Sequence, residues 1–153
     1  MRKVSDLINL PVIDLTSGRQ LATIKDVVLN ADNDILHGFL CENKLLPLGK
    51  VKNFGKDAVI VEIDDLDLIL EKYKDPVNPP NFLPGYIIGT PIMTEGGKYL
   101  GTIGDILVED NSGKILGYEV SDGLLKDLVS GRSLLTVPQI ITYGEDAVII
   151  KEE

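Results

Sequence analysis

Short runs of alternating apolar and polar residues recur along this chain, and clusters of Gly, Asn and Asp separate them. The runs are rich in β-branched residues, a pattern typical of strands in a small antiparallel barrel or sandwich. Two series of strands are predicted. The first comprises residues 12–15, 20–30, 35–42, 45–48 and 58–62, and the second comprises residues 91–94, 99–109, 114–121, 134–137 and 147–151.

Helical periodicity is short and local. Residues 4–10 predict at most one helical turn, with Ser5 as its N-cap and Pro11 ending it. A second helix is predicted to begin at the capping residue Asp65. Its apolar face comprises Leu66, Ile69, Leu70 and Tyr73.

The chain is an internal repeat. Residues 21–26, LATIKD, return as residues 100–105, LGTIGD, and residues 57–60, DAVI, return as residues 146–149. Two copies of one small unit are therefore predicted, each of a size at which independent folding is marginal.

Prolines at positions 76, 79, 80 and 84 predict a stiff, extended connection between the copies, because proline fixes its own φ and restrains its predecessor. The predicted organisation is a first repeat over residues 1–75, a Pro-rich linker over 76–86 and a second repeat over 87–153.

The copies differ by an insertion. Counterparts lie 79 or 80 positions apart in the first part of the repeat and 89 positions apart after it, so residues 122–131 are extra in the second copy. This segment predicts a short helix, which is interpreted either as a lid over an open barrel end or as an exposed docking helix. The residues on its apolar face, a candidate protein interface, are Leu124, Leu125, Leu128 and Val129.

The charge of the chain limits the classes of molecule that it is expected to bind. The formal net charge is −9, with 10 basic and 13 acidic residues in positions 1–76 and 5 and 11 in positions 77–153. Nucleic acids and anionic membranes are disfavoured, because both are bound through Lys and Arg. A protein partner, or a second copy of the chain in a homodimer, is expected.

Cys41 is the one cysteine, and the sequence contains no signal-like segment and no apolar run long enough to span a membrane. We therefore expect a cytoplasmic protein without an internal disulfide.

Few residues suggest chemistry, and no catalytic residue, cofactor or metal ligand is predicted. Residues 30–34 resemble the start of a calcium loop but lack its later ligands, so an Asx-rich turn is predicted. His37 and Cys41 lie on one strand with Cα atoms about 13 Å apart, too far to act together. Asp26 and Asp105 recur at one position of an apolar strand, where each is expected to accept hydrogen bonds from backbone amides.

The order of motifs in each copy resembles the PRC-barrel family. It consists of a Pro-Val or Pro-Ile strand, a turn, Leu-x-Thr-Ile-x-Asp, an Asx turn, a strand with a central Gly, Leu-Leu, and a closing Gly-x-Asp-Ala-Val-Ile. The resemblance covers almost the whole chain and implies an all-β protein of two small, highly bent antiparallel barrels in tandem. The family includes the cytoplasmic part of the photosynthetic reaction-centre H subunit and the C-terminal domain of a ribosome maturation factor. The resemblance implies an interaction module and supplies no catalytic residues.

Three functions therefore stay open. The leading hypothesis is a non-enzymatic adaptor that binds a protein. The alternatives are a small-ligand or metal-binding sensor with its site between the barrels, and an enzyme that uses Asp26 or Asp105.

Overall fold

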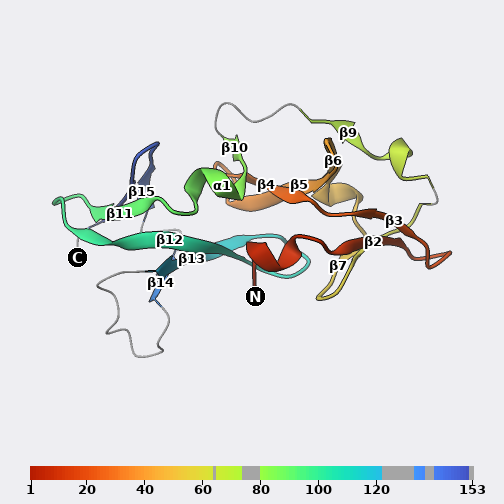
Figure 1. Cartoon of the computed structure of the whole chain (residues 1–153), viewed down its shortest axis with the longest axis horizontal. Helices are drawn as coiled ribbons and strands as arrows, with labels where there is room; N and C mark the ends of the chain where they lie inside the picture. The colour runs from red at the N-terminus through yellow and green to blue at the C-terminus, as the bar shows by residue number, and fades with distance from the viewer. Residues whose placement is uncertain (64, 74–79, 122–132, 137–139, 152–153) are drawn as a thin grey trace.

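The chain folds into an elongated, mostly β body, seen here in a computed structural model that describes residues 1–63, 65–73, 80–121, 133–136 and 140–151 (Figure 1). The all-β class expected from the sequence is confirmed. Among the described residues no helix has the length and apolarity needed to cross a bilayer.

The first repeat contains short strands and two 3₁₀ turns before the linker. They are β1 (Arg2–Lys3), η1 (Val4–Leu7), β2 (Pro11–Asp14), β3 (Gln20–Thr23), β4 (Asp26–Asn30), β5 (Ile35–Cys41), β6 (Lys44–Pro47), η2 (Leu48–Lys50), β7 (Asn53–Phe54) and β8 (Val59–Val61). Between the repeats lie η3 (Leu66–Leu68) and β9 (Glu71–Lys72).

The second repeat follows a similar order of elements, with one long strand in place of two. They are β10 (Asn81–Phe82), α1 (Pro84–Ile87), β11 (Pro91–Thr94), β12 (Tyr99–Val108), β13 (Ile115–Ser121), β14 (Ser133–Thr136), β15 (Ile140–Tyr143) and β16 (Val148–Ile150). Each repeat contains one parallel pair, β2 with β8 and β11 with β16, among otherwise antiparallel neighbours.

The two repeats treat one predicted strand differently. Residues 20–30 divide into β3 and β4, which belong to separate sheets, whereas residues 99–108 form the single strand β12 that pairs with both β11 and β13. Gly101 and Gly104 lie within β12, and their counterparts in the first repeat are Ala22 and Lys25. Glycine lets a strand bend while it stays paired, so β12 continues where the first repeat breaks.

Both helical predictions need correction. The helix predicted from Asp65 is only the 3₁₀ turn η3, in which the Asp65 carboxylate accepts from the Asp67 amide at 3.1 Å. Where that helix would have continued, the chain instead forms β9, which pairs with β6. The N-terminal turn exists as η1, but its N-cap is Lys3, and the hydroxyl of Ser5 donates to Asp105 instead.

The repeats exchange their first strands. β1 of the first repeat pairs with β12 of the second, placing Arg2 opposite Val108. β10, which precedes the second repeat, pairs with β4 of the first, placing Phe82 opposite Leu29. These two pairings are counterparts of each other, so the exchange is reciprocal, and Figure 1 shows the N-terminus and α1 near the middle of the body.

A local two-fold axis relates the repeats. Ile35 forms an isolated antiparallel bridge with Lys114, its own counterpart. On either side of the bridge the Leu36 amide donates to the Gly113 carbonyl at 2.7 Å, and the Ile115 amide donates to the Asp34 carbonyl at 2.8 Å. Each bond is the symmetry mate of the other, so the two repeats meet here as equal halves.

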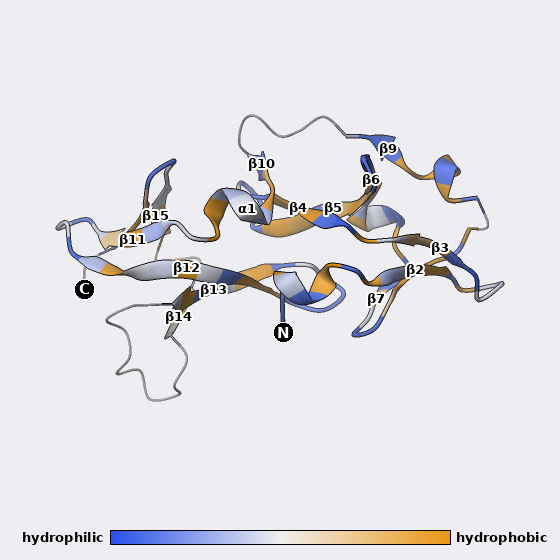
Figure 2. Cartoon of the chain, in the orientation of Figure 1, coloured by the Kyte–Doolittle hydropathy of each residue, from blue (hydrophilic) through white to orange (hydrophobic). Residues whose placement is uncertain are grey.

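One hydrophobic core serves both repeats. A single cluster of buried side chains includes Ile24, Leu36 and Phe39 from the first repeat with Ile103 and Tyr118 from the second. Figure 2 shows hydrophobic residues along β4 and β5 and hydrophilic ones along β9. Since burial of apolar area is the main stabilising contribution, the halves depend on each other for stability. The repeat and linker boundaries predicted at residues 75 and 86 remain a prediction. Hydrogen bonds join the segments on either side of these boundaries.

Candidate functional site

Two pockets lie at counterpart positions where each exchanged segment meets the other repeat. The first has a volume of about 470 Å³ and is lined by Met1, Arg2, Lys3, Asp6, Lys56, Asp57, Leu107 and Asp110. The second has a volume of about 290 Å³ and is lined by Ala31, Phe82, Tyr86, Ile87, Ile141, Thr142 and Tyr143. The positions correspond, but the chemistry differs.

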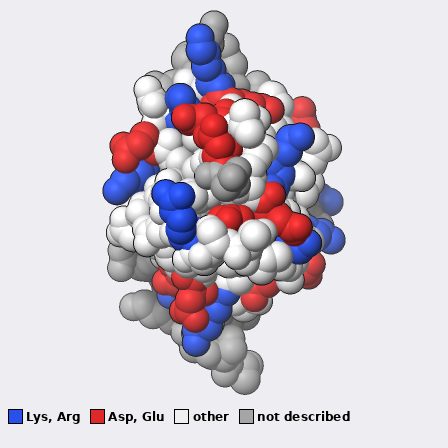
Figure 3. All heavy atoms as spheres, turned by 90° about the vertical axis from the view of Figure 1, so that its right-hand side faces the viewer, with Lys and Arg blue, Asp and Glu red and all other residues white. Residues whose placement is uncertain are grey.

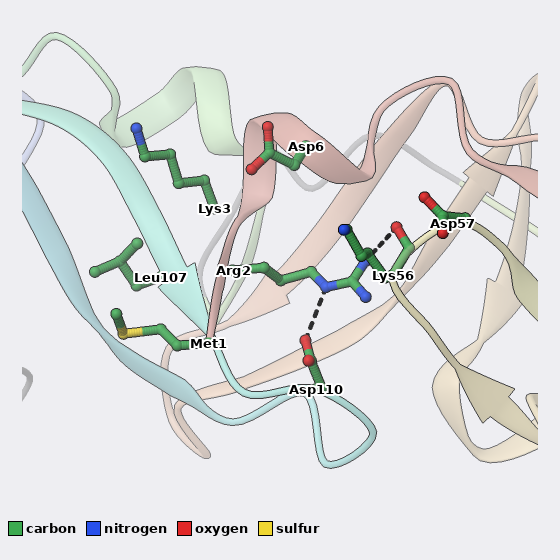
Figure 4. Close-up of a pocket in the computed structure, with 8 residues that line it drawn as sticks. All are labelled: Met1, Arg2, Lys3, Asp6, Lys56, Asp57, Leu107 and Asp110. Atoms are coloured by element: carbon green, nitrogen blue, oxygen red, sulfur yellow. Dashed lines mark hydrogen bonds and ion pairs between the residues drawn. The ribbon is translucent and has the colours of Figure 1, made fainter.

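Charged side chains line the first pocket, and Arg2 organises them (Figure 4). Its Nε donates to Asp110 Oδ1 at 2.7 Å, and its Nη1 donates to the Lys56 carbonyl at 3.4 Å. The guanidinium lies over the ring of Phe54, 4.8 Å from the centroid. Only 9% of the Arg2 side chain is exposed; Nε and Nη1 have these partners, whereas Nη2 is buried without a hydrogen-bond partner.

Apolar and aromatic side chains line the second pocket. Phe82 is the counterpart of Arg2, Tyr143 is the counterpart of Phe54, and Ala31 of the first repeat is the counterpart of Asp110 of the second. The rings of Phe82 and Tyr86 lie 6.3 Å apart. Tyr86 and Ile141 are 47% and 48% exposed, so the apolar wall of the pocket reaches the surface.

A pair of tyrosines, Tyr118 buried and Tyr143 partly buried, lies at the second pocket. Tyr118 and Tyr143 pack edge to face with centroids 6.0 Å apart, as their counterparts Phe39 and Phe54 do at 5.4 Å. The Tyr118 hydroxyl donates to the Tyr143 hydroxyl at 3.1 Å. Burial raises the pKa of the Tyr143 phenol against the opposing effect of the hydrogen bond from Tyr118, and burial is also the main cause that raises the pKa of Tyr118. Both phenols are therefore neutral at physiological pH.

The recurrent aspartates Asp26 and Asp105 bond to backbone amides, as the sequence predicts. Asp26 Oδ1 accepts from the Val27 amide and Asp105 Oδ1 from the Ile106 amide, each at 2.8 Å. The buried Asp105 also accepts from the Ser5 amide and hydroxyl, a contact between the repeats. The counterpart of Ser5 is Gly85, which cannot offer Asp26 a hydroxyl. Neither aspartate lines either pocket.

The other residues considered for chemistry stay apart. His37 and Cys41 both lie on β5, where His37 is half-buried and Cys41 is buried. Burial raises the pKa of the Cys41 thiol to about 11. Residues 30–34 form the predicted turn, closed by the Asn33 amide donating to Asn30 Oδ1 at 2.9 Å. Within the described part of the chain, no three His, Cys, Asp or Glu side chains gather as a metal site.

The candidate interface on the insertion cannot be compared with this geometry. Leu124, Leu125, Leu128 and Val129 lie outside the described residues. That prediction stays a prediction.

Surface charge is mixed at the end of the body formed by β2, β3 and β7. Figure 3 shows Lys and Arg side chains interspersed with Asp and Glu on that face. Ion pairs of opposite charge, such as Lys52 with Glu62 at 2.8 Å, occur there. Such a face offers no single-sign patch to steer a polyanion.

Sequence reasoning missed both pockets. Only 5% of the residues are aromatic, which gives no indication of an aromatic site. Three of them, Phe82, Tyr86 and Tyr143, nevertheless meet at one pocket. The available signal was the comparison of counterparts: where Arg2 and Asp6 stand in the first repeat, Phe82 and Tyr86 stand in the second.

Comparison with protein families agrees with the repeat. A model of the PRC-barrel domain matches the chain twice, over residues 1–68 and residues 85–153. The resemblance inferred from the repeated motifs is thereby confirmed for both copies. A sequence comparison with curated proteins found no match.

Proposed function

Because this chain belongs to the PRC-barrel domain family, as a tandem pair of its domains, we propose that it is a non-enzymatic adaptor that binds a protein partner at its second pocket. One observation carries the proposal. At counterpart positions, charged side chains that include the Arg2–Asp110 ion pair line the first pocket, whereas apolar and aromatic side chains line the second, with Tyr86 and Ile141 exposed beside it.

The size and lining of the second pocket suit a protein side chain. A volume of about 290 Å³ is enough for one large residue, and apolar pockets with an aromatic wall are where binding energy concentrates at protein interfaces. The site is also built on both repeats, since Ala31 comes from the first and the other lining residues from the second. A scaffold held by one core keeps such a pocket preformed, which lowers the entropic cost of binding.

The side chains considered for catalysis support binding rather than catalysis. Asp105 is engaged by Ser5 and its own strand, and Cys41 is a buried thiol whose pKa is raised to about 11, far from a reactive thiolate. The cytoplasmic location expected from the sequence is part of the same proposal.

Affinity capture from native extract tests this function when it is paired with a pocket variant. The double variant Tyr86→Asp, Ile141→Asp places two charges at the rim, and Leu15→Asp is the matched control because Leu15 is 52% exposed and lies outside the pocket. We expect a partner that the wild type and the control recover equally and that the double variant recovers at least tenfold less. That partner, once purified, should show the same order of affinities in calorimetry.

Equal recovery by all three proteins would place binding elsewhere, and repeated recovery of nothing would count against an adaptor. A second copy of the chain is identified as the partner if sedimentation shows a dimer that the double variant converts to a monomer. A different protein is identified if the wild type sediments as a monomer.

A further inference from the structure

The lining residue Arg2 of the first pocket lies against an aromatic ring. The Arg2 guanidinium lies 4.8 Å from the centroid of Phe54 and is paired with the Asp110 carboxylate. An aromatic face attracts a cation at such a distance through its quadrupole, and more strongly when both groups are shielded from water. The first repeat thus satisfies its ring with a side chain of its own.

The second pocket keeps the aromatic ring but contains no such cation. Tyr143 replaces Phe54, and the position of Arg2 is taken by a further ring, Phe82. Tyr86 adds a third ring in place of Asp6. No Lys or Arg is among the described residues that line this pocket. Three aromatic side chains therefore line the second pocket, whereas the guanidinium of Arg2 lines its counterpart, the first pocket.

A carboxylate lies close to the same space. Asp34 belongs to the turn that contributes Ala31 to the pocket wall, although it does not itself line the pocket. Burial raises the pKa of the Asp34 carboxyl, and the charge of Lys114 opposes that shift. Asp32, in the same turn, is exposed. Aromatic faces with a nearby carboxylate favour an organic cation over an anion or a neutral polar group.

We propose that the second pocket binds the alkylammonium or guanidinium group of a Lys or Arg side chain from a partner protein. The inference rests on the proposed function, because it names the group that the partner inserts. The aliphatic stem of Lys or Arg suits the apolar wall formed by Ile87 and Ile141 while the charged head lies among the rings. The net charge of −9 steers a basic partner towards this protein.

Matched probes of equal shape and different charge test the inference. Butylguanidinium is an analogue of the Arg side chain, and butylurea is its neutral isostere. Each is titrated into the full-length ¹⁵N-labelled protein while backbone amide shifts of residues 86 and 140–143 are followed. We expect butylguanidinium to shift these amides with at least a tenfold lower dissociation constant than butylurea, and to bind less tightly as salt rises.

Variants test whether butylguanidinium binds at the second pocket, and they separate the contribution of an aromatic ring from that of a carboxylate. Tyr86→Leu removes a ring and keeps an apolar side chain, and we expect it to weaken butylguanidinium at least threefold. Tyr99→Leu is the matched control, because Tyr99 is also an exposed tyrosine, lies outside the pocket and should leave affinity unchanged. Asp34→Asn should weaken butylguanidinium and leave butylurea unaffected.

The source of the cation is tested with a short capped peptide containing one Arg and its twin containing citrulline, the neutral isostere of Arg. Preference for the Arg peptide supports the proposal. Binding of butylguanidinium without either peptide overturns it in favour of a small organic cation, and equal binding of butylurea and butylguanidinium overturns it in favour of a neutral apolar ligand. If binding of a protein partner depends on Tyr86 while neither butylguanidinium nor the Arg peptide binds, the adaptor function stands and the cation inference is wrong.

Discussion

At the scale of single residues, the clearest constraints lie beside the two-fold axis. Gly113 has φ +71°, and a Cβ added to it would lie 2.7 Å from Leu48 Cδ2 and 3.0 Å from Leu36 Cβ. Its carbonyl accepts one of the two bonds that join the repeats. The position therefore needs glycine both for its backbone conformation and for the close approach of the other repeat.

Gly113→Ala should reduce the free energy of unfolding by about 2–4 kcal/mol, from left-handed strain and overpacking together. Gly18→Ala is the control, because Gly18 has a similar φ of +72° with no atom within 4 Å of the added Cβ. Its cost should be limited to about 1–2 kcal/mol of strain. Chemical denaturation of both variants measures the difference, and equal costs would show that the contact at the axis contributes nothing.

Asp14 predicts a pH dependence. Its carboxylate accepts from the Ser17 hydroxyl at 2.6 Å and from the amides of Ser17, Thr16 and Ile63, and these bonds, the Ser17 hydroxyl first, lower the pKa of Asp14 against the opposing effect of burial. A group with a lowered folded-state pKa contributes stability above its ordinary pKa, and that contribution is lost as pH falls through the folded-state value.

Asp14→Asn should therefore lower Tm at pH 7, and the difference from wild type should shrink as the pH falls below the ordinary carboxyl pKa of about 3.8. Thermal unfolding monitored by circular dichroism across this range measures it. Asp32→Asn, in an exposed turn, is the control and should change Tm little at any pH. A Tm difference that does not vary with pH would contradict the assignment.

At the scale of elements, the exchanged strands occupy equal positions with unequal chemistry. Leu83, after β10, packs against the small cluster of Val28, Leu40 and Leu45. Its counterpart Lys3, in β1, instead pairs with Glu119 at 3.3 Å, and both side chains of that pair are partly exposed. One segment is thus fixed by burial and the other by an ion pair near water.

Leu83→Ala should cost about 1–3 kcal/mol of unfolding free energy, because Leu83 is only partly buried and its packing contacts are lost. Lys3→Ala should cost less than about 1 kcal/mol, since exposed ion pairs contribute little. Urea denaturation of the two variants compares them, and a larger loss for Lys3→Ala would reverse the account of the two segments.

The sequence predicted most strands because alternation and turn residues are local signals. It failed where partners lie far along the chain. β1 and β10 are two residues long and carry no alternation of their own, so only their distant partners β12 and β4 make them strands. The helix predicted at Asp65 failed for the same reason: apolar residues at helical spacing are drawn instead to the core and to the pairing of β9 with β6. The pockets depend on the same long-range pairing.

At the scale of the whole molecule, duplication has produced one body with two non-equivalent sites. Reciprocal exchange and a shared core join the repeats, and each pocket is lined by residues from both of them. Charged side chains line one pocket, and apolar and aromatic side chains line the other. The proposed function depends on this arrangement, because moving the repeats apart would dismantle both pockets.

Crosslinking at the two-fold axis tests this arrangement most directly. Ile35 and Lys114 face each other as a non-hydrogen-bonded antiparallel pair, the kind whose Cα atoms lie closest, at about 4.5 Å, within the range that a disulfide spans. In the variant Ile35→Cys, Lys114→Cys, we predict that mild oxidation forms a disulfide between these positions within one folded chain, with Cys41 remaining a buried thiol, as peptide mapping by mass spectrometry would show. Free thiols at 35 and 114 after oxidation of the folded protein, or links only between separate chains, would contradict the account.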